Sequence, residues 1–270
     1  MEPAFNKLLI PVDFSVNTEV AVKKAISLAG AGKAVLHLLH VVAPRKRIAA
    51  IKARNDLMQW EWHIRESHSG LDVKIHVLKG YSVQRMIIEC ATMLSPDMII
   101  IGKQCDRRNW FSFRGISPDV VARKTNCPVL TVKPGSIDSL TKVIVIPIRD
   151  FLPERKLEWA VLLARKYRAQ VHLLAIRGHR EEGHLPQVFL NAYHHLREHL
   201  HHPIEFSTAV QQNPAKAALS YAELIMADII LVNPEAESGV GGFGGGRHMS
   251  NLLRRDSKLQ ILDVEPYKNN

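Results

Sequence analysis

The chain has 270 residues, with 36 lysines and arginines against 26 acidic residues. That length is enough for two domains of about 135 residues, each with an ordinary core. No apolar run reaches the ~18 residues that a membrane-spanning helix needs, and Glu2 and Asp13 flank the short apolar stretch at the N-terminus. We therefore expect no transmembrane helix, no signal peptide and a cytoplasmic location. Three cysteines are too few for a disulfide scaffold or a zinc site.

The positive charge is concentrated in the first half of the chain. Residues 1–135 hold 20 basic against 11 acidic residues, whereas residues 136–270 hold 16 against 15. A basic half can attract phosphate-bearing ligands, nucleic acid or an acidic protein surface. No aromatic residues interleave with the basic ones as they do on nucleic-acid platforms, so we favour a solvated basic surface and do not expect nucleic acid as a partner.

In the first half, short apolar runs alternate with segments of helical period. Five runs are predicted to be buried strands: Leu8–Val12, Val35–Val42, Val73–Leu78, Met98–Ile101 and Val129–Val132. Helices are predicted over 18–29, capped by Asn17, and over 83–94, capped by Ser82. Such alternation predicts a parallel sheet with helices on both faces.

The second half repeats this order. Its predicted strands are Val143–Ile146, Val171–Ile176, Ile204–Ala209, Ile229–Val232 and Leu259–Val264. Helices are predicted to begin near Pro153 and Pro214 and to cover 187–200 and 249–255. Landmarks of the first half recur about one domain length later: Pro11 as Pro147, His37 as His172 and Asp97 as Asp228. We therefore predict two copies of one fold, residues 1–135 and 139–270, joined by a short turn-rich linker.

Four segments carry a resemblance to a known family: Pro11–Ser15, Leu38–Val42, Asp97–Gly102 and Asn126–Val132. In order and spacing they are similar to the universal stress protein family, here in tandem form. The resemblance implies an α/β fold of two doubly wound domains, each with a five-stranded parallel sheet of order 3-2-1-4-5 flanked by helices. It also implies an internal pseudo-dimer in which the closing strands of the two halves meet. Many members of the family bind ATP.

The family's nucleotide signature is Gly, two residues, Gly, nine residues, then Gly followed by Ser or Thr. Here the four positions hold Gly102, Cys105, Gly115 and Ile116, so the spacing is kept and two determinants are lost. Glycines let backbone N–H groups approach phosphates, and the hydroxyl opens a helix that receives them. Restoring Gly at 105 and Ser at 116 should, on this interpretation, raise the affinity for ATP.

Neighbouring residues leave two interpretations of this loop open. Ser117 precedes Pro118 and is predicted to cap a helix through its own hydroxyl, which favours a structural role. Lys103, together with arginines 107, 108 and 114, gives the loop positive charge that could recruit phosphate without the missing glycine. We favour a structural cap beside a solvated basic loop, with a retained nucleotide site as the alternative.

The resemblance also assigns roles to two residues at strand ends. Asp13 would lie beside the ribose and phosphates, and the backbone of Val41 would contact the adenine edge. The simpler interpretations are a helix-entry turn for Asp13 and a buried strand residue for Val41. The candidate cofactor-binding residues are Asp13, Val41, Gly102, Lys103, Gly115 and Ser117.

The second half departs further from the signature. Arg149 replaces the aspartate, and two carboxylates follow Asn233 at the start of the loop. Residues 239–246 are rich in glycine but match no phosphate-loop spacing, so we predict a mobile loop there.

Seven of the 14 histidines lie within 179–202. His195 and His199 share one face of the predicted helix, and His202 could supply a third ligand. No cysteine or carboxylate completes a tetrahedral set, so we favour a polar helix face and expect no metal site.

No segment matches a catalytic motif: there is no nucleophile elbow and no complete Walker sequence. We therefore predict a non-enzymatic stress-response or signalling module with a degenerate nucleotide loop and protein partners whose identity the sequence does not indicate. The alternative is an ATP-binding, weakly hydrolysing protein that uses its first half. A weaker alternative is metal binding through the histidine-rich helix.

Overall fold

The computed structural model describes residues 5–30, 33–103, 116–136, 141–149, 152–177, 187–210, 214–233 and 258–266. Cys105, Gly115, the loop arginines, the glycine-rich segment and the helix predicted over 249–255 lie outside these ranges. None of the described helices is long and apolar enough to cross a membrane.

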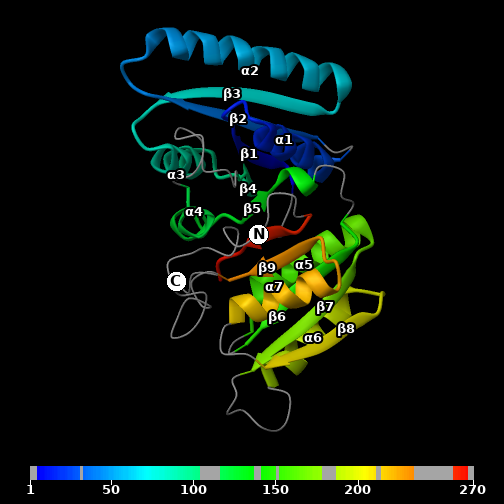
Figure 1. Cartoon of the computed structure of the whole chain (residues 1–270). Helices are drawn as coiled ribbons and strands as arrows, with labels where there is room; N and C mark the ends of the chain where they lie inside the picture. Colours follow the sequence, from blue (N-terminus) through cyan, green and yellow to red (C-terminus); the bar gives the residue numbers. More distant parts are fainter. Residues whose placement is uncertain are drawn as a thin grey trace.

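Within the described residues, ten strands form one sheet (Figure 1). They are β1 (Lys7–Pro11), β2 (Ala34–Val42), β3 (Leu71–Lys79), β4 (Met98–Gly102), β5 (Val129–Val132), β6 (Val143–Ile148), β7 (Gln170–Arg177), β8 (Ile204–Val210), β9 (Ile229–Val232) and β10 (Gln260–Asp263). Every predicted strand is present, with ends that differ by a few residues at most.

Helices cover both faces of this sheet. They are α1 (Val16–Ala29), α2 (Arg47–Ser67), α3 (Val83–Leu94), α4 (Pro118–Thr125), α5 (Glu154–Tyr167), α6 (Gln187–His199) and α7 (Pro214–Leu224). A short 3-10 turn, Pro134–Ser136, follows β5. α2 has no counterpart among the sequence predictions, whereas the predicted helix over 83–94 is confirmed at both ends.

The strand order is β3-β2-β1-β4-β5-β10-β9-β6-β7-β8. Each half therefore has the predicted order 3-2-1-4-5, with all neighbours inside a half parallel. The halves join where β5 and β10 pair antiparallel, with Leu130 opposite Leu262. The predicted meeting of the two closing strands is confirmed, and it removes two apolar edges that would otherwise be open to aggregation.

The hydrophobic core explains why the halves form one body. On the face covered by α1, α2, α5 and α6, a single buried cluster runs from the first half into the second. On the face of α3, α4 and α7, the core is divided into two clusters, one for each half. On the face where one cluster spans both halves, the rings of Phe5 and Trp159 pack edge to face, with centroids 5.7 Å apart.

Polar contacts reinforce the junction. The guanidinium of Arg155, on α5, donates to Asn126 Oδ1 (2.7 Å), to the Asn126 carbonyl (2.7 Å) and to the Glu265 carbonyl (3.2 Å). Asn126 ends α4 in a left-handed conformation, which leaves its carbonyl free of the helix ladder. A second-half side chain thus caps a first-half helix.

The repeated aspartate has the same structural role in both halves. Asp97 Oδ2 accepts hydrogen bonds from the backbone N–H groups of Asn6 (2.9 Å) and Lys7 (2.8 Å). Asp228 Oδ2 accepts from Lys142 (2.7 Å) and Val143 (3.0 Å) in the same way. Each carboxylate ties the start of a half's fourth strand to the start of its first strand, which accounts for the sequence repeat.

Two helix starts test the predicted caps. Ser82 is confirmed, because its side chain accepts a hydrogen bond from the backbone N–H of Arg85. The cap predicted at Asn17 is wrong: α1 begins earlier, after Ser15, and Asn17 is buried in its first turn. The reason is Asp13, whose side chain organises the turn that starts the helix.

Candidate functional site

The candidate site lies at the carboxyl ends of β1 and β4. These strands are neighbours in the sheet, but the chain leaves β1 toward β2 on one side and reaches β4 on the other. Such a reversal opens a crevice beyond the strand ends, the usual ligand position in doubly wound folds. Asp13 follows β1, and Gly102 and Lys103 end and follow β4, so three of the six candidate residues are brought together.

Asp13 binds the start of α1. Its Oδ1 accepts hydrogen bonds from the Ser15 backbone N–H (3.1 Å), the Ser15 hydroxyl (2.5 Å) and the Thr18 hydroxyl. Among the described residues, no hydrogen bond engages Oδ2, and the side chain is half-buried. The helix-entry role is therefore present, and among the described residues it uses only one of the two carboxylate oxygens.

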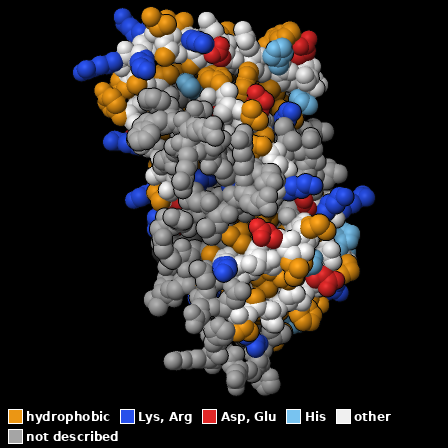
Figure 2. All heavy atoms as spheres, in the orientation of Figure 1, with side chains coloured by type: hydrophobic (Ala, Val, Ile, Leu, Met, Phe, Trp, Pro, Cys, Tyr) orange, Lys and Arg blue, Asp and Glu red, His pale blue; other side chains and the backbone are white. Residues whose placement is uncertain are grey.

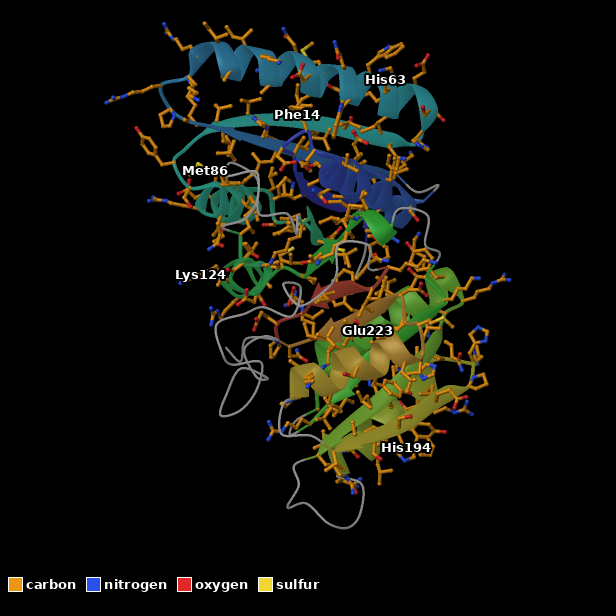
Figure 3. The ribbon with its side chains drawn as sticks, in the orientation of Figure 1. Phe14, His63, Met86, Lys124, His194 and Glu223 are labelled. Carbon is orange, nitrogen blue, oxygen red and sulfur yellow. The ribbon has the colours of Figure 1, made fainter. Side chains whose placement is uncertain are left out.

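An aromatic cluster beside Asp13 escaped the sequence reasoning. Phe14 has a φ of 59°, a left-handed conformation that is costly for an aromatic residue. Its ring contacts His40 (centroids 4.9 Å apart) and Trp60 of α2 (5.7 Å) on the side of the sheet that α2 covers (Figure 3). His40 Nδ1 lies 2.7 Å from the Val12 carbonyl oxygen. The only sequence signal was an aromatic residue in a helix-entry turn.

Gly102 is required by packing. A Cβ atom at this position would lie 2.0 Å from the Asn17 carbonyl oxygen and 2.4 Å from its carbon, so the first turn of α1 rests directly on β4. The backbone N–H of Lys103 donates to the Val132 carbonyl (3.0 Å) and links the ends of β4 and β5. Lys103 and Lys133 are both buried at this edge, with 6% and 1% exposure. Two lysines therefore directly follow the neighbouring strands β4 and β5 at this edge.

Val41 lies one strand away from this crevice. It pairs with Leu78 of β3, and its half-buried side chain packs against the core on the α3 face. Among the described residues, the last hydrogen bond from the β1 segment to β2 runs from Val12 N–H to the Leu39 carbonyl (2.7 Å). Val41 therefore lies just beyond the end of the β1 ladder, beside the crevice.

The entrance of α4 differs from the family pattern. Ile116 stands where the signature has a hydroxyl, and its side chain is 3% exposed, inside the core cluster that contains Leu39, Ile87 and Val121. Ser117 occupies the N-cap position, but the predicted capping bond from its hydroxyl is absent. The Ser117 backbone N–H instead donates to Gln84 Oε1 (2.8 Å), at the start of α3. Gly115 lies outside the described residues.

Side chains fill the corresponding edge of the second half. Lys156 is 1% exposed and its Nζ donates to the Pro147 carbonyl (2.6 Å) near the end of β6. Asn233 replaces Gly102 at the end of β9, and its Nδ2 donates to the Val264 carbonyl (2.6 Å). Arg149 follows β6 in place of the aspartate. The two halves therefore present different chemistry at equivalent edges.

The histidine-rich helix presents no metal geometry in the part of the chain that is described. The rings of His195 and His199 stack with centroids 4.7 Å apart, and His199 Nδ1 lies 2.8 Å from the His195 carbonyl oxygen. No group of three potential ligands occurs among the described residues. His179 and His184 lie outside them.

Two other histidines, buried His37 and half-buried His76, form a pair on the sheet. His37 Nδ1 lies 2.9 Å from His76 Nε2, and the rings stack at 5.1 Å. Burial, followed by the neighbouring His76, Lys74 and Lys7, lowers the pKa of His37 from 6.5 to about 4, and burial also lowers the pKa of His76. Both rings are therefore neutral in the folded protein at pH 7.

This pair predicts loss of stability in mild acid. A histidine whose pKa is lowered by folding binds fewer protons in the folded state, so its stabilisation is complete above pH 6.5 and is lost as the pH falls toward 4. We expect the free energy of unfolding to fall by about 2 kcal/mol across this range. Urea unfolding at several pH values measures the slope of the free energy of unfolding against pH. His37→Gln should reduce this slope between pH 6.5 and 4, whereas His63→Gln, at an exposed position, should leave it unchanged. Equal slopes for the wild type and His37→Gln would contradict this assignment.

The fold and the site together define a tandem doubly wound α/β protein with Asp13 and two buried lysines at the carboxyl ends of the strands of its first half. Residues 4–133 match the universal stress protein family. The first half of the chain thus belongs to the universal stress protein family, and the second half, which this match does not cover, repeats the same strand order.

Solved structures share this architecture over the full length. A universal stress protein from Archaeoglobus fulgidus aligns with 100% of this chain and 99% of its own, at a TM-score of 0.71 and 17% identity. A putative universal stress protein from Pseudomonas aeruginosa aligns with 97% of this chain and 93% of its own, at a TM-score of 0.61 and 20% identity. The cytoplasmic domain of a prokaryotic cation chloride cotransporter aligns with 98% of this chain and 97% of its own, at a TM-score of 0.59 and 14% identity. These likenesses establish the fold alone. No curated protein matches the sequence.

Proposed function

We propose that this chain is a non-enzymatic stress-response or signalling module, an internal pseudo-dimer of the domains 1–135 and 139–270. The observation that carries the proposal is the burial of Ile116 in the apolar core, where the family signature places a phosphate-binding hydroxyl. Gly102 also supports a nucleotide-independent role. The contact of β4 with the first turn of α1 explains why this position needs a glycine, without any ligand. On this proposal, the module works through contacts with proteins and does not require a nucleotide.

The second candidate is adenine-nucleotide binding by the first half. Two observations favour it: among the described residues no hydrogen bond engages Oδ2 of Asp13, and Lys103 and Lys133 directly follow β4 and β5 at the same edge of the sheet. Buried cations at the end of a parallel sheet suit phosphate oxygens. Asp13, Val41, Gly102, Lys103, Gly115 and Ser117 would be the binding residues in that case.

Titration with Mg-ATP separates the two candidates. We expect no saturable binding by isothermal titration calorimetry at protein concentrations of about 50 µM, where a micromolar site would be filled. If heat is released, the nucleotide candidate requires Asp13→Asn to weaken binding by about tenfold. Asn keeps an oxygen that accepts from Ser15, but it replaces the second carboxylate oxygen, which would accept from a ribose hydroxyl, with an NH2 donor. Arg149→Gln, at the equivalent place in the second half, is the control and should change nothing. Micromolar binding that only Asp13→Asn weakens would overturn the nucleotide-independent proposal.

A further inference from the structure

The outward side of α2 carries an apolar stripe. Ile48, Ile51, Met58 and Trp62 are 85%, 64%, 51% and 59% exposed. Figure 1 places α2 at the outer end of the molecule, beyond β3, and Figure 2 shows hydrophobic and basic side chains gathered there. Scattered exposed apolar residues are ordinary, but four on one side of one helix mark an interaction surface.

This outward stripe is separate from the stripe that holds α2 on the sheet. Ala53, Leu57 and Ile64 are buried against the core, and Trp60 packs beside them. At 100° per residue, these positions lie opposite the exposed ones. A surface helix needs only one apolar stripe to fold onto its domain. The second stripe is therefore surplus to the fold of this chain.

The spacing of the outward stripe is that of a helix-pairing seam. Positions 48, 51, 55, 58 and 62 alternate steps of three and four residues, the heptad pattern of coiled coils. Asn55 is the central, polar member, the type of residue that fixes register in such seams. The next position, Arg65, is held on its own sheet, because its guanidinium donates to Asp72 (2.7 Å) and to the Val73 carbonyl (2.8 Å).

Charges beside the stripe specify the direction of pairing. Arg47, Lys52 and Arg54 flank its N-terminal half, and Glu61 and Glu66 flank its C-terminal half. An antiparallel second α2 would place the basic half of each helix against the acidic half of the other. A parallel one would place like charges together, which is unfavourable.

We propose that two copies of this chain associate through an antiparallel pair of α2 helices. In this register Ile51 packs against Trp62 of the second copy, Asn55 lies beside Met58, and Arg54 approaches Glu61. Within one chain Glu61 already pairs with Arg65 (3.0 Å), so Arg54 would join this ion pair as a second cation. The carboxylates at one end of the stripe make an anionic membrane a poorer occupant than a second copy. Because α2 lies far from the β5–β10 junction, the pairing leaves the internal pseudo-dimer intact and does not depend on nucleotide binding.

Sedimentation equilibrium of the full chain tests the association. We expect dimers at about 100 µM, and we expect Met58→Glu to raise the dissociation constant at least about 30-fold, because it places a carboxylate in the apolar seam. Met93→Glu is the matched control: Met93 is 71% exposed on α3, and this change should leave the dimer unaffected. A wild-type chain that is monomeric at about 100 µM, or equal effects of the two substitutions, overturns the proposal.

Cross-linking tests the direction. Cys90 and Cys127 are buried, and burial raises the pKa of their thiols to about 11 and about 12, so neither competes with an exposed thiol. In a Cys105→Ser background, chains carrying Ile51→Cys should form disulfides with chains carrying Trp62→Cys far more than either does alone. Preferential linkage of Ile51→Cys chains to each other would show parallel pairing and overturn the proposal. So would monomers that bind vesicles of phosphatidylcholine and phosphatidylserine through Met58.

Discussion

Gly102→Ala should lower the free energy of unfolding by about 3 kcal/mol or more. The new methyl group would lie 2.0 Å from the Asn17 carbonyl oxygen, and this neighbour is backbone in the first turn of α1 that cannot rotate away. The turn must therefore move off β4, and the hydrogen bonds that Asp13 makes to Ser15 and Thr18 must distort with it. Urea unfolding followed by circular dichroism measures the loss.

Gly80→Ala is the matched control for this prediction. Its added Cβ would meet the Met86 side chain at 2.5 Å, near the start of α3 (Figure 3). Because a methionine side chain has several rotatable bonds, it can shift, and we expect a loss below about 1 kcal/mol. If the two substitutions lower the free energy of unfolding by similar amounts, α1 can move away from the added methyl group. Packing would then not explain Gly102, and a role in ligand binding would become the better explanation.

Ile116→Ser should lower the free energy of unfolding by about 3 kcal/mol and should not create ATP affinity. The substitution removes apolar volume from a site that is 3% exposed and places a hydroxyl among Leu39, Ile87 and Val121. The sequence-based expectation, that a serine here restores a phosphate contact, assumed a side chain at the protein surface. The structure shows that this side chain belongs to the core.

Ile116→Val separates the effect of lost apolar volume from the effect of a buried hydroxyl. It removes one methylene group and adds no polar atom, so we expect the free energy of unfolding to fall by only about 1 kcal/mol. Unfolding curves and Mg-ATP titrations of the two variants under identical salt provide the measurement. A stable Ile116→Ser chain that gains nucleotide binding would show that α4 can rotate its first residue toward the crevice.

Local sequence determined most of the secondary structure. The inner strands are short runs rich in Val, Ile and Leu, and such runs are recognisable because both faces of a parallel sheet are buried. The edge strands β3 and β8 are less buried and carry more polar residues. The domain repeat was visible for the same reason: Asp97 and Asp228 stand at equivalent strand starts and bind the same backbone groups. The strand order and the meeting of the closing strands came from the family resemblance and are confirmed.

α2 was missed because its periodicity is ambiguous. With one apolar stripe against the sheet and another facing outward, the segment 47–67 shows no single hydrophobic face in sequence. Only the packed structure distinguishes the two stripes, since burial depends on which side of the helix meets the core.

The candidate site depended still more on tertiary structure. Sequence placed Asp13 and Gly102 at strand ends, but the reason for the glycine is the approach of a helix that begins after Ser15. The burial of Ile116 follows from the packing of α4 on the sheet, and the left-handed backbone of Phe14 follows from its contacts with His40 and Trp60. Sequence pattern predicted all ten strands and every described helix except α2, because the formation of these elements depends mainly on neighbouring residues. The roles of the site side chains depend on residues distant in the chain, which only the folded structure brings together.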